Sequence, residues 1–484
     1  MKNISEVNNV PIQQKLKVIK EVFPELFTGS KIDMEKLQYM LGDHVESLPY
    51  ELVWKGKQEA RTEATQEPTK VLYPCISKSV NWDETRNLYI EGDNLETLRW
   101  LKQTHHHKIK MIYIDPPYNT GMDFIYHDTF MDPGLRTIQE RLTSMHTNWL
   151  NFMYPRLMLA CNLLTEDGMI FISIGDRELY NLKKMCDEIF GEDNFVTTLI
   201  WEKKKKPSFL DRNVGNVTEY IVVYSRNKGK THALSLERTE KGKKYPFNNA
   251  GNPERVLTFP EGSVQFHLRD GIVKAQDMSR GKIRTELLDD VKIENGVNKH
   301  PFRLRGEWRY SQVKLNEIVQ KGETISISKI PFRPNYVREG GGVKKLKNLF
   351  TLSGYGLPTY EDADRELTKL FGKKVFDYAK PVGLIRTLIE SLLYGDDEAI
   401  VLDFFSGTGT TGEAVWQLNQ TLRKRLSFIL VQSPEEIHPK SEAYKEGYRT
   451  ISELGMERLN RVREGLAHSG NKQDTGFRYY KFEN

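Results

Sequence analysis

Cysteine is scarce in this chain, which has only Cys75, Cys161 and Cys186 among its 484 residues. Their positions show no paired spacing, so the sequence predicts neither a disulfide framework nor a zinc site, and it fits a reducing cytosol. Long apolar runs are also missing, because no stretch approaches the ~18 consecutive apolar residues that a membrane span needs. The first residues lack the apolar core of a signal peptide. We therefore expect a cytoplasmic protein that has no membrane segment and holds no metal.

The chain has many charged residues but only a small net charge. The chain has 71 Lys and Arg against 66 Asp and Glu, which gives a formal net charge of +5. This mild excess permits a nucleic-acid partner without requiring one, so the places where charge is concentrated matter more than the total. With 38% hydrophobic and 28% charged residues, the composition is that of a globular protein. The length suggests about three domains.

The most informative stretch is a buried strand that ends in an acid, two prolines and an aromatic ring. The β-forming run 111–114 leads directly into Asp115, Pro116, Pro117 and Tyr118. Open α/β sheets bind their ligands at the carboxyl ends of strands, and two prolines make the backbone rigid and leave its carbonyls free to accept hydrogen bonds. An acid, a free carbonyl and a flat ring suit a planar molecule with an exocyclic amine. The alternative is a plain strand-ending turn, since Asp and Pro are common in turns.

A second buried strand, 399–405, runs into a glycine-rich turn and then a helix. The turn contains Gly407, Gly409 and Gly412, which fit the dinucleotide pattern G-x-G-x-x-G. Glycines let a backbone approach a ligand closely, and a helix N-terminus offers free N–H groups to it. A nicotinamide-dependent oxidoreductase is therefore an alternative. Such an enzyme would have an acid at the end of the next strand, where it binds the ribose of the dinucleotide. Here the strand 427–431 is followed by Gln432, and the acid Glu435 comes slightly late.

Three further features leave alternatives open. Asp93 follows a strand and precedes a helix, so it either caps that helix or accepts a hydrogen bond from a ligand. The run of three histidines at 105–107 lies in a loop and cannot converge on one metal, which favours a solvated turn. The basic run 203–206 is either a solvated surface loop or a loop that faces phosphates, and we favour phosphates.

Alternating strand, turn and helix patterns predict an α/β fold with a doubly wound, mostly parallel sheet. Interleaved basic and aromatic residues between its two halves, for example at 308–310, predict an inserted recognition domain that contacts phosphates and bases. The predicted parts are a helical N-terminal segment (1–72), a catalytic part (73–225), the inserted target-recognition domain (226–372), a cofactor-binding part (373–466) and a C-terminal tail (467–484).

The two turns together resemble those of amino-methyltransferases that use S-adenosylmethionine. The family's Asp-Pro-Pro-Tyr signature matches 115–118, and its Phe-x-Gly-x-Gly signature matches 405–409. The catalytic signature comes first, as in β-class DNA methyltransferases. Further matches at 54–57, 87–98, 119–121 and 378–381 are similar to the modification (Mod) subunit of type III restriction-modification systems, over about three-quarters of the chain on a motif argument.

This resemblance implies methyl transfer from S-adenosylmethionine to the N6 amine of a flipped-out adenine in double-stranded DNA. It implies that Asp115, Pro116, Pro117 and Tyr118 are catalytic. The residues that it assigns to the cofactor are Asp93, Lys380, Asp403, Phe405, Ser406, Gly407, Gly409, Thr410 and Glu435. It also implies a homodimer and a restriction (Res) helicase-nuclease subunit as a partner. A DNA-recognition subunit without catalysis is a third hypothesis, and it predicts binding without methyl incorporation.

Overall fold

The computed structural model of this chain describes residues 20, 23, 26–28, 31–32, 51–122, 128–132, 134, 137–207, 213–337, 340–467 and 473–482. The chain divides into two units, Met1–Lys57 and Gln58–Asn484. In the first unit, β1 (Phe27–Thr28) pairs antiparallel with β2 (Lys31–Ile32). Most of the helical spacing predicted for 1–72 lies outside the described residues, and α3 (Lys57–Glu63) is a described helix in that range.

A ten-stranded sheet forms the centre of the second unit. Most neighbouring strands are parallel, and the antiparallel pairs are β7–β8, β8–β6 and β25–β3. In spatial order the strands are β22 (Leu349–Phe350), β7 (Phe195–Glu202), β8 (Thr218–Ser225), β6 (Leu164–Ile174), β5 (Ile109–Ile114), β23 (Ile400–Asp403), β24 (Ser427–Gln432), β4 (Leu88–Glu91), β25 (Arg478–Phe482) and β3 (Leu72–Pro74).

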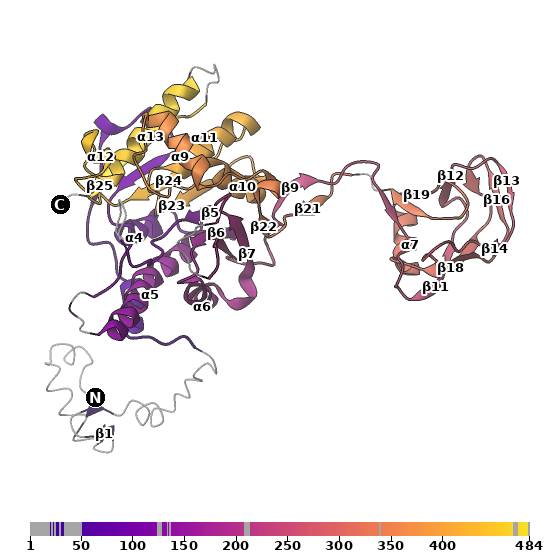
Figure 1. Cartoon of the computed structure of the whole chain (residues 1–484), viewed down its shortest axis with the longest axis horizontal. Coiled ribbons are helices and arrows are strands. Elements are labelled where there is room, and N and C mark those ends of the chain that lie inside the picture. The colour runs from indigo at the N-terminus through magenta and orange to yellow at the C-terminus, as the bar shows by residue number, and fades with distance from the viewer. Residues whose placement is uncertain are drawn as a thin grey trace, which may run out of the picture. The chain divides into compact units, whose positions relative to one another are not determined.

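Helices cover both faces of this sheet (Figure 1). One layer consists of α4 (Asn94–Thr104), α5 (Ile138–Leu163) and α6 (Leu179–Phe190), and the other contains α9 (Tyr360–Phe371), α10 (Val382–Leu393), α11 (Thr410–Leu422) and α13 (Ile451–Ala467). Shorter helices are η3 (Ile76–Lys78), η4 (Glu192–Asn194), α8 (Leu352–Tyr355) and α12 (Glu442–Lys445). The predicted doubly wound, mostly parallel α/β fold is confirmed. No helix among the described residues is long and apolar enough to cross a membrane.

The two strands that carry the sequence motifs are neighbours in the sheet. β5 and β23 run parallel, with Met111 opposite Val401 and Ile112 opposite Leu402. All four of these side chains are buried, as expected for parallel strands covered on both faces. On one side β5 pairs with β6, and on the other side β23 pairs with β24. The chain thus leaves the two strands in opposite directions, and this arrangement opens a crevice beyond their carboxyl ends.

Residues Arg478–Phe482 form a strand of the sheet, so the predicted C-terminal tail is wrong for this stretch. β25 pairs parallel with β4 and antiparallel with β3. Phe477 and Tyr479 are almost completely buried in the main core, and the Tyr479 ring stacks on Tyr89 with 5.6 Å between ring centroids. Alternate residues of this aromatic segment point into the core, which is the pattern of a strand.

Along the chain, an inserted unit lies between β8 and β22. It has its own hydrophobic core, formed by buried residues from Phe247 to Tyr336. It contains α7 (Gln312–Gln320). One sheet has β10 (Lys244–Pro246), β20 (Asn335–Val337), β19 (Thr324–Ile327), β12 (Val264–Phe266), β17 (Val297–Asn298), β16 (Val291–Glu294) and β13 (Gly271–Val273). The other has β11 (Glu254–Phe259), β18 (Phe302–Glu307), β15 (Thr285–Leu287) and β14 (Gln276–Asp277).

The outgoing and returning segments of this insertion pair with each other. β9 (Ser235–Arg238) and β21 (Val343–Lys345) form an antiparallel two-stranded ladder. Beyond that ladder, Phe350, Leu357 and Tyr360 pack into the core of the main sheet. The last part of the predicted range 226–372 therefore packs with the main body and not with the inserted core.

Candidate active site

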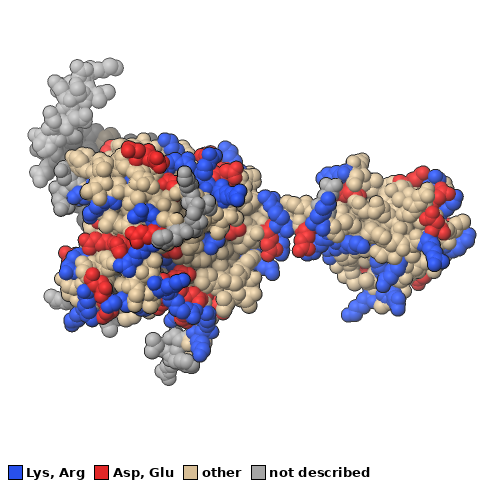
Figure 2. Space-filling model, turned by 90° about the horizontal axis from the view of Figure 1, so that it is seen from above, with Lys and Arg blue, Asp and Glu red and all other residues tan. Residues whose placement is uncertain are grey.

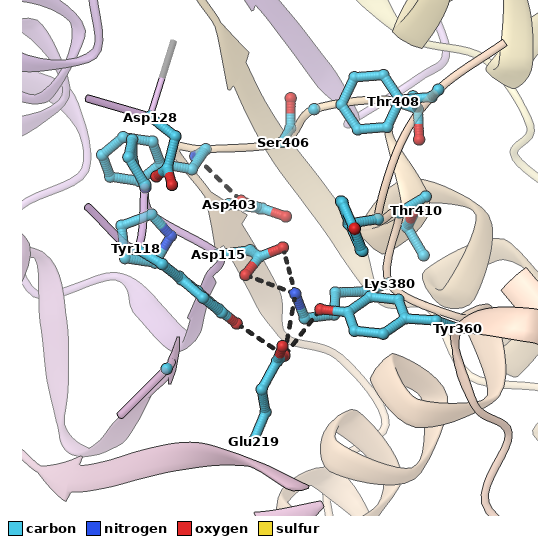
Figure 3. A pocket seen from close by; sticks show the side chains of 18 of the residues that line it. Asp115, Tyr118, Asp128, Glu219, Tyr360, Lys380, Asp403, Ser406, Thr408 and Thr410 are labelled. Atoms are coloured by element: carbon cyan, nitrogen blue, oxygen red, sulfur yellow. Dashed lines mark hydrogen bonds and ion pairs between the residues drawn. The ribbon is translucent and has the colours of Figure 1, made fainter. Parts of the chain in front are cut away.

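A cavity of about 450 Å³ lies beyond the carboxyl ends of β5 and β23, a volume typical of small-molecule sites. Side chains from both predicted turns line it (Figure 3). The predicted residues in its lining are Asp115, Pro116, Pro117, Tyr118, Lys380, Asp403, Phe405, Ser406, Gly407, Thr410 and Glu435. Two predicted cofactor residues, Asp93 and Gly409, are not part of this lining.

The proline turn is held in place by the helix and the strand next to it. Trp149, on α5, donates its indole Nε1–H to the Pro117 carbonyl at 2.7 Å. Among the described residues, none donates a hydrogen bond to the Pro116 carbonyl, which keeps the predicted freedom to accept from a ligand. The Tyr118 ring lies close to Gly175, which directly follows β6. A side chain at that position would meet the ring, so glycine lets the tyrosine lie flat against the backbone.

The residues after Tyr118 form a second set of anchors. Asn119 has a left-handed backbone with φ of 58°, and its amide N–H and that of Thr120 both donate to the Asp128 carboxylate, at 3.0 and 2.9 Å. The Asn119 side chain donates to Glu178 at 2.6 Å, and Arg177 donates to the Asn119 carbonyl at 2.9 Å. Three side chains from two segments, Asp128 and the adjacent pair Arg177 and Glu178, thus fix the turn before any ligand arrives, which is the preorganisation that catalysis needs.

An ionic cluster surrounds the acid of the turn (Figure 3). The Lys380 ammonium donates to both Asp115 carboxylate oxygens at 2.8 Å and lies 3.8 Å from the Glu219 carboxylate. Burial raises the pKa of Asp115, and the Lys380 charge opposes that rise. Lys380 was expected to contact a cofactor, and the structure places its ammonium on the acid of the proline turn.

Glu219, on β8, connects this cluster to two aromatic rings. It accepts hydrogen bonds from the hydroxyls of Tyr118 at 3.2 Å and Tyr360 at 2.7 Å, and from the Lys203 ammonium at 3.1 Å. Burial and the nearby Asp115 and Glu219 carboxylates raise the pKa of Tyr118 well above its ordinary value, so its hydroxyl stays protonated and donates.

The basic run 203–206 divides between the pocket and the surface. Lys203 points to Glu219, which contradicts a phosphate-facing role for this residue. Lys205 pairs with Asp362 at 3.3 Å. Lys204 lines the pocket, Lys206 is exposed, and neither forms an ion pair with any described residue. These two remain candidates for contacts with phosphate.

The glycine-rich turn has the backbone that its sequence predicts. Gly407 and Gly409 have φ of 52° and 80°, which side chains rarely adopt, and α11 begins directly after Gly409. Gln432, at the end of β24, accepts from the Gly407 N–H at 2.7 Å. The buried Ser406 hydroxyl has no hydrogen-bond partner among the described residues. A buried polar group of this kind is normally satisfied, so it indicates a place for a ligand.

Asp403 stabilises the start of this turn from the end of β23. It accepts from the Thr411 hydroxyl at 2.6 Å and from the Phe405 N–H at 3.1 Å. Burial raises the pKa of Asp403 to about 7, the two hydrogen bonds oppose the rise, and the nearby Asp115 carboxylate adds to it. This carboxyl therefore changes its charge near neutral pH.

Arg458, on α13, supports the same turn from the opposite side. It is 1% exposed, and its guanidinium donates to the hydroxyls of Thr408 at 2.9 Å and Thr410 at 2.7 Å. It also pairs with Glu413 at 2.8 Å. Both threonines line the pocket, so Arg458 fixes the wall of the cavity without reaching its interior.

The structure decides what Asp93 does. Its side chain accepts from the Glu96 N–H at 2.9 Å and caps α4, and Arg156 pairs with its other oxygen at 3.4 Å. The side chain is 58% exposed. Of the two alternatives left open for Asp93, the structure shows the helix cap.

Sequence reasoning missed Glu219, Tyr360 and Asp128 as pocket residues. Glu219 carried a usable signal, because a single acid inside the apolar strand 218–225 must find a partner when it is buried. Tyr360 was hidden by its position in the range assigned to the inserted domain. Asp128 follows no motif, and nothing local distinguishes it.

Comparison with known proteins agrees with this geometry. A family described as DNA methylase matches residues 109–443. The StyLTI Mod subunit of Salmonella typhimurium, a type III restriction-modification enzyme, is 33% identical over 453 residues, 90% of this chain and 66% of that protein. The EcoPI Mod subunit of Escherichia phage P1 is 32% identical, over 98% of this chain and 78% of its own length. The EcoP15I Mod subunit of Escherichia coli is also 32% identical, over 99% and 78%.

The chain spans just under two thirds of the StyLTI subunit and more than three quarters of the two others. The family match includes both turns that line the pocket. This chain belongs to the DNA methylase family and, within it, to the modification subunits of type III restriction-modification systems.

Proposed function

We propose that this pocket transfers a methyl group from S-adenosylmethionine to the N6 amine of an adenine flipped out of double-stranded DNA. The observation that carries the proposal is the single cavity shared by the Asp115–Tyr118 turn and the Phe405–Thr410 turn. One turn offers an acceptor and a ring to a planar amine, and the other offers a close-approach backbone to a cofactor. Family membership decides against the nicotinamide-dependent alternative.

The residues at the glycine-rich turn fit S-adenosylmethionine. The free hydroxyl of Ser406 needs a partner, and a Cβ added at Gly407 would meet only the Phe376 ring, at 3.9 Å, so there is room for a ligand. Phe405, Ser406, Gly407, Thr410 and Glu435 would hold the cofactor. When bound, it supplies an electrophilic methyl group. Gly409 and Asp403 act indirectly by shaping the turn.

The catalytic turn prepares the amine for attack. The lone pair of an adenine amine is delocalised into the ring, so the nitrogen is a poor nucleophile. Asp115 and the Pro116 carbonyl each accept one N–H, which favours a pyramidal nitrogen with its lone pair directed at the methyl carbon. As the N–C bond forms, the bond between that carbon and the donor sulfur breaks, and the proton that the nitrogen loses passes to Asp115. Tyr118 stacks on the base, and such stacking is worth ~1–3 kcal/mol. This stabilisation is comparable to the free energy needed to flip the base, so contacts with phosphates must supply the remaining binding free energy.

The inserted unit reads the DNA sequence in this proposal, with limits of about 244 to 337. Figure 2 shows Lys and Arg side chains on the surface of this unit and of its connecting segments. Three exposed cations, Arg280, Lys282 and Arg284, lie on the connection between β14 and β15, and none forms an ion pair with a described residue. Unpaired cations at a turn suit DNA phosphates.

The partners in this proposal are double-stranded DNA, a second copy of the chain and a restriction subunit, all inside the cytoplasm. The second copy and the restriction subunit rest on the family alone. Light scattering of the purified chain, with and without a restriction subunit of the same family, tests both.

The decisive experiment measures transfer of labelled methyl groups from S-adenosylmethionine to DNA, followed by mapping of the methylated positions. The wild type should modify one adenine in a defined sequence. Asp115→Ala and Tyr118→Ala should lose at least about a hundredfold in rate, with cofactor binding retained. Full activity of the Asp115 variant would contradict this mechanism. Sequence-specific binding by the wild type without incorporation would favour the recognition-only hypothesis.

A further inference from the structure

The Lys380 ammonium occupies the place that the target amine needs. It donates to both oxygens of Asp115 at 2.8 Å, and only 6% of Lys380 is exposed. The proposed reaction requires the same carboxylate to accept an N–H from adenine. A cation close to the amine also disfavours the positive charge that develops on the nitrogen when the N–C bond forms. The target amine and the Lys380 ammonium therefore compete for the Asp115 carboxylate.

A buried ammonium cannot simply leave its carboxylate, because an unpaired charge in an apolar environment is very unfavourable. Among the residues that the structure describes, the Lys380 ammonium has one other carboxylate partner. Glu219 lies 3.8 Å from the ammonium and is itself 6% exposed. The rings of Tyr118 and Tyr360 flank the ammonium, with distances of 5.0 and 5.1 Å to the ring centroids, as Figure 3 shows.

Glu219 is held ready to accept this charge. One of its oxygens accepts from Lys203 at 3.1 Å, and the other accepts from the hydroxyls of Tyr118 and Tyr360. The second oxygen is also the one that faces Lys380. A small movement of a flexible lysine side chain, with no movement of the backbone, would turn the 3.8 Å approach into a hydrogen bond.

We propose that Glu219 is a positioning residue that takes over the Lys380 ammonium when the target amine binds Asp115. In the base-free enzyme the positive charge of Lys380 balances the negative charge of Asp115 and favours the ionised form of that carboxyl. When the base enters, the ammonium moves to Glu219, and Asp115 becomes free to accept the amine N–H. This inference rests on the proposed function, since it assigns a step within the same pocket.

A simpler role for Glu219 would be to hold the hydroxyls of Tyr118 and Tyr360. The two roles predict different substrate selectivity. Loss of ring positioning weakens stacking on any purine, whereas loss of the charge acceptor penalises only a base whose amine must displace the ammonium.

The test compares two DNA duplexes that carry the mapped recognition sequence, one with adenine and one with purine, which lacks the amine, at the target position. Their dissociation constants are measured with S-adenosylhomocysteine present. Glu219→Gln keeps an oxygen that accepts from the tyrosine hydroxyls but removes the charge. The preference for adenine, given by the ratio of the two dissociation constants, should fall about tenfold in this variant. The reason is that the state in which the ammonium has left Asp115 is less populated.

Four further variants make this result specific. Glu219→Asp, which keeps the charge, should retain most of the preference, and Tyr360→Phe should weaken both duplexes equally. In a Lys380→Met background, Glu219→Gln should leave the preference unchanged, because no ammonium remains to be moved. Glu166→Gln removes an exposed carboxylate that pairs with Lys230 and serves as the control for loss of an acid.

An unchanged preference in Glu219→Gln, or an equal loss in the Lys380→Met background, would overturn the inference. If Glu219→Gln does not fold, the Glu219→Asp and Tyr360→Phe variants decide, because a fall in preference for Tyr360→Phe would assign the effect to the rings. Failure of the proposed function can be told apart from failure of this inference, because the wild type itself would then incorporate no methyl groups.

Discussion

The Tyr118 ring lies against the backbone of Gly175, so closely that a Cβ added at Gly175 would stand 3.1 Å from the Tyr118 Cδ2. The two residues follow β5 and β6, which are parallel neighbours. The position of the ring that is proposed to stack on the base is therefore set by the lack of a side chain at Gly175, directly after the neighbouring strand.

Gly175→Ala should shift the Tyr118 ring by a few tenths of an ångström and lower the methylation rate by about tenfold, because small misplacements at a reacting centre are costly. Gly175→Val should lower it further. Binding of S-adenosylmethionine should remain unchanged in both variants. A matched control is Gly465→Ala on α13, where a Cβ meets nothing within 4 Å, and this variant should keep full activity.

Arg458→Met should weaken S-adenosylmethionine binding by about tenfold, since it removes the donors that hold two threonines of the pocket wall and leaves the Glu413 charge poorly paired. Isothermal titration calorimetry measures this change. Arg461→Met, on the same helix, removes a more exposed pair with Glu457 and should change binding by less than about twofold. Equal effects of the two substitutions would contradict the role assigned to Arg458.

The stability of the fold should depend on pH through Asp403. Its pKa of about 7 in the folded protein lies above the ordinary value of 3.8, so the folded state binds this proton more tightly than the unfolded chain. The contribution is complete below the unfolded pKa and is lost as pH rises through about 7. Asparagine cannot ionise, so Asp403→Asn should gain in melting temperature relative to wild type between about pH 5 and about pH 8. A constant difference across that range would show that Asp403 does not titrate there.

Phe477→Ala tests whether the aromatic segment near residue 480 is part of the core. Removing this fully buried ring should destabilise the main body by about 3–5 kcal/mol, which a lower melting temperature of the main transition would report. Lys481→Ala on the same strand, an exposed position, should have little effect. A dispensable tail would tolerate both substitutions equally.

The sequence was sufficient for features that depend on neighbours along the chain. A strand followed by Asp115 and Tyr118, or by Phe405 and Gly407, is a local pattern, and alternating units imply that such turns meet at one edge of a sheet. The contacts of Glu219 are different. Its partners Tyr118 and Tyr360 are 101 and 141 residues away, and no period or motif connects them.

The same limit explains the errors. The segment around Tyr479 looked like a tail because its partner strands begin at Leu72 and Leu88, about 400 positions earlier in the chain. Lys380 belongs to a family motif, but the motif does not show whether its side chain reaches the proline turn or the glycine-rich turn of the pocket. That depended on Asp115, 265 residues away.

The ladder between β9 and β21 has a consequence for the inserted unit that it carries. Val343 lies opposite Arg238, so the chain leaves the main body and returns to it at one place. In the proposed function, a unit joined in this manner can be exchanged for another reading unit while Asp115, Glu219 and Lys380, all outside the ladder, keep their positions.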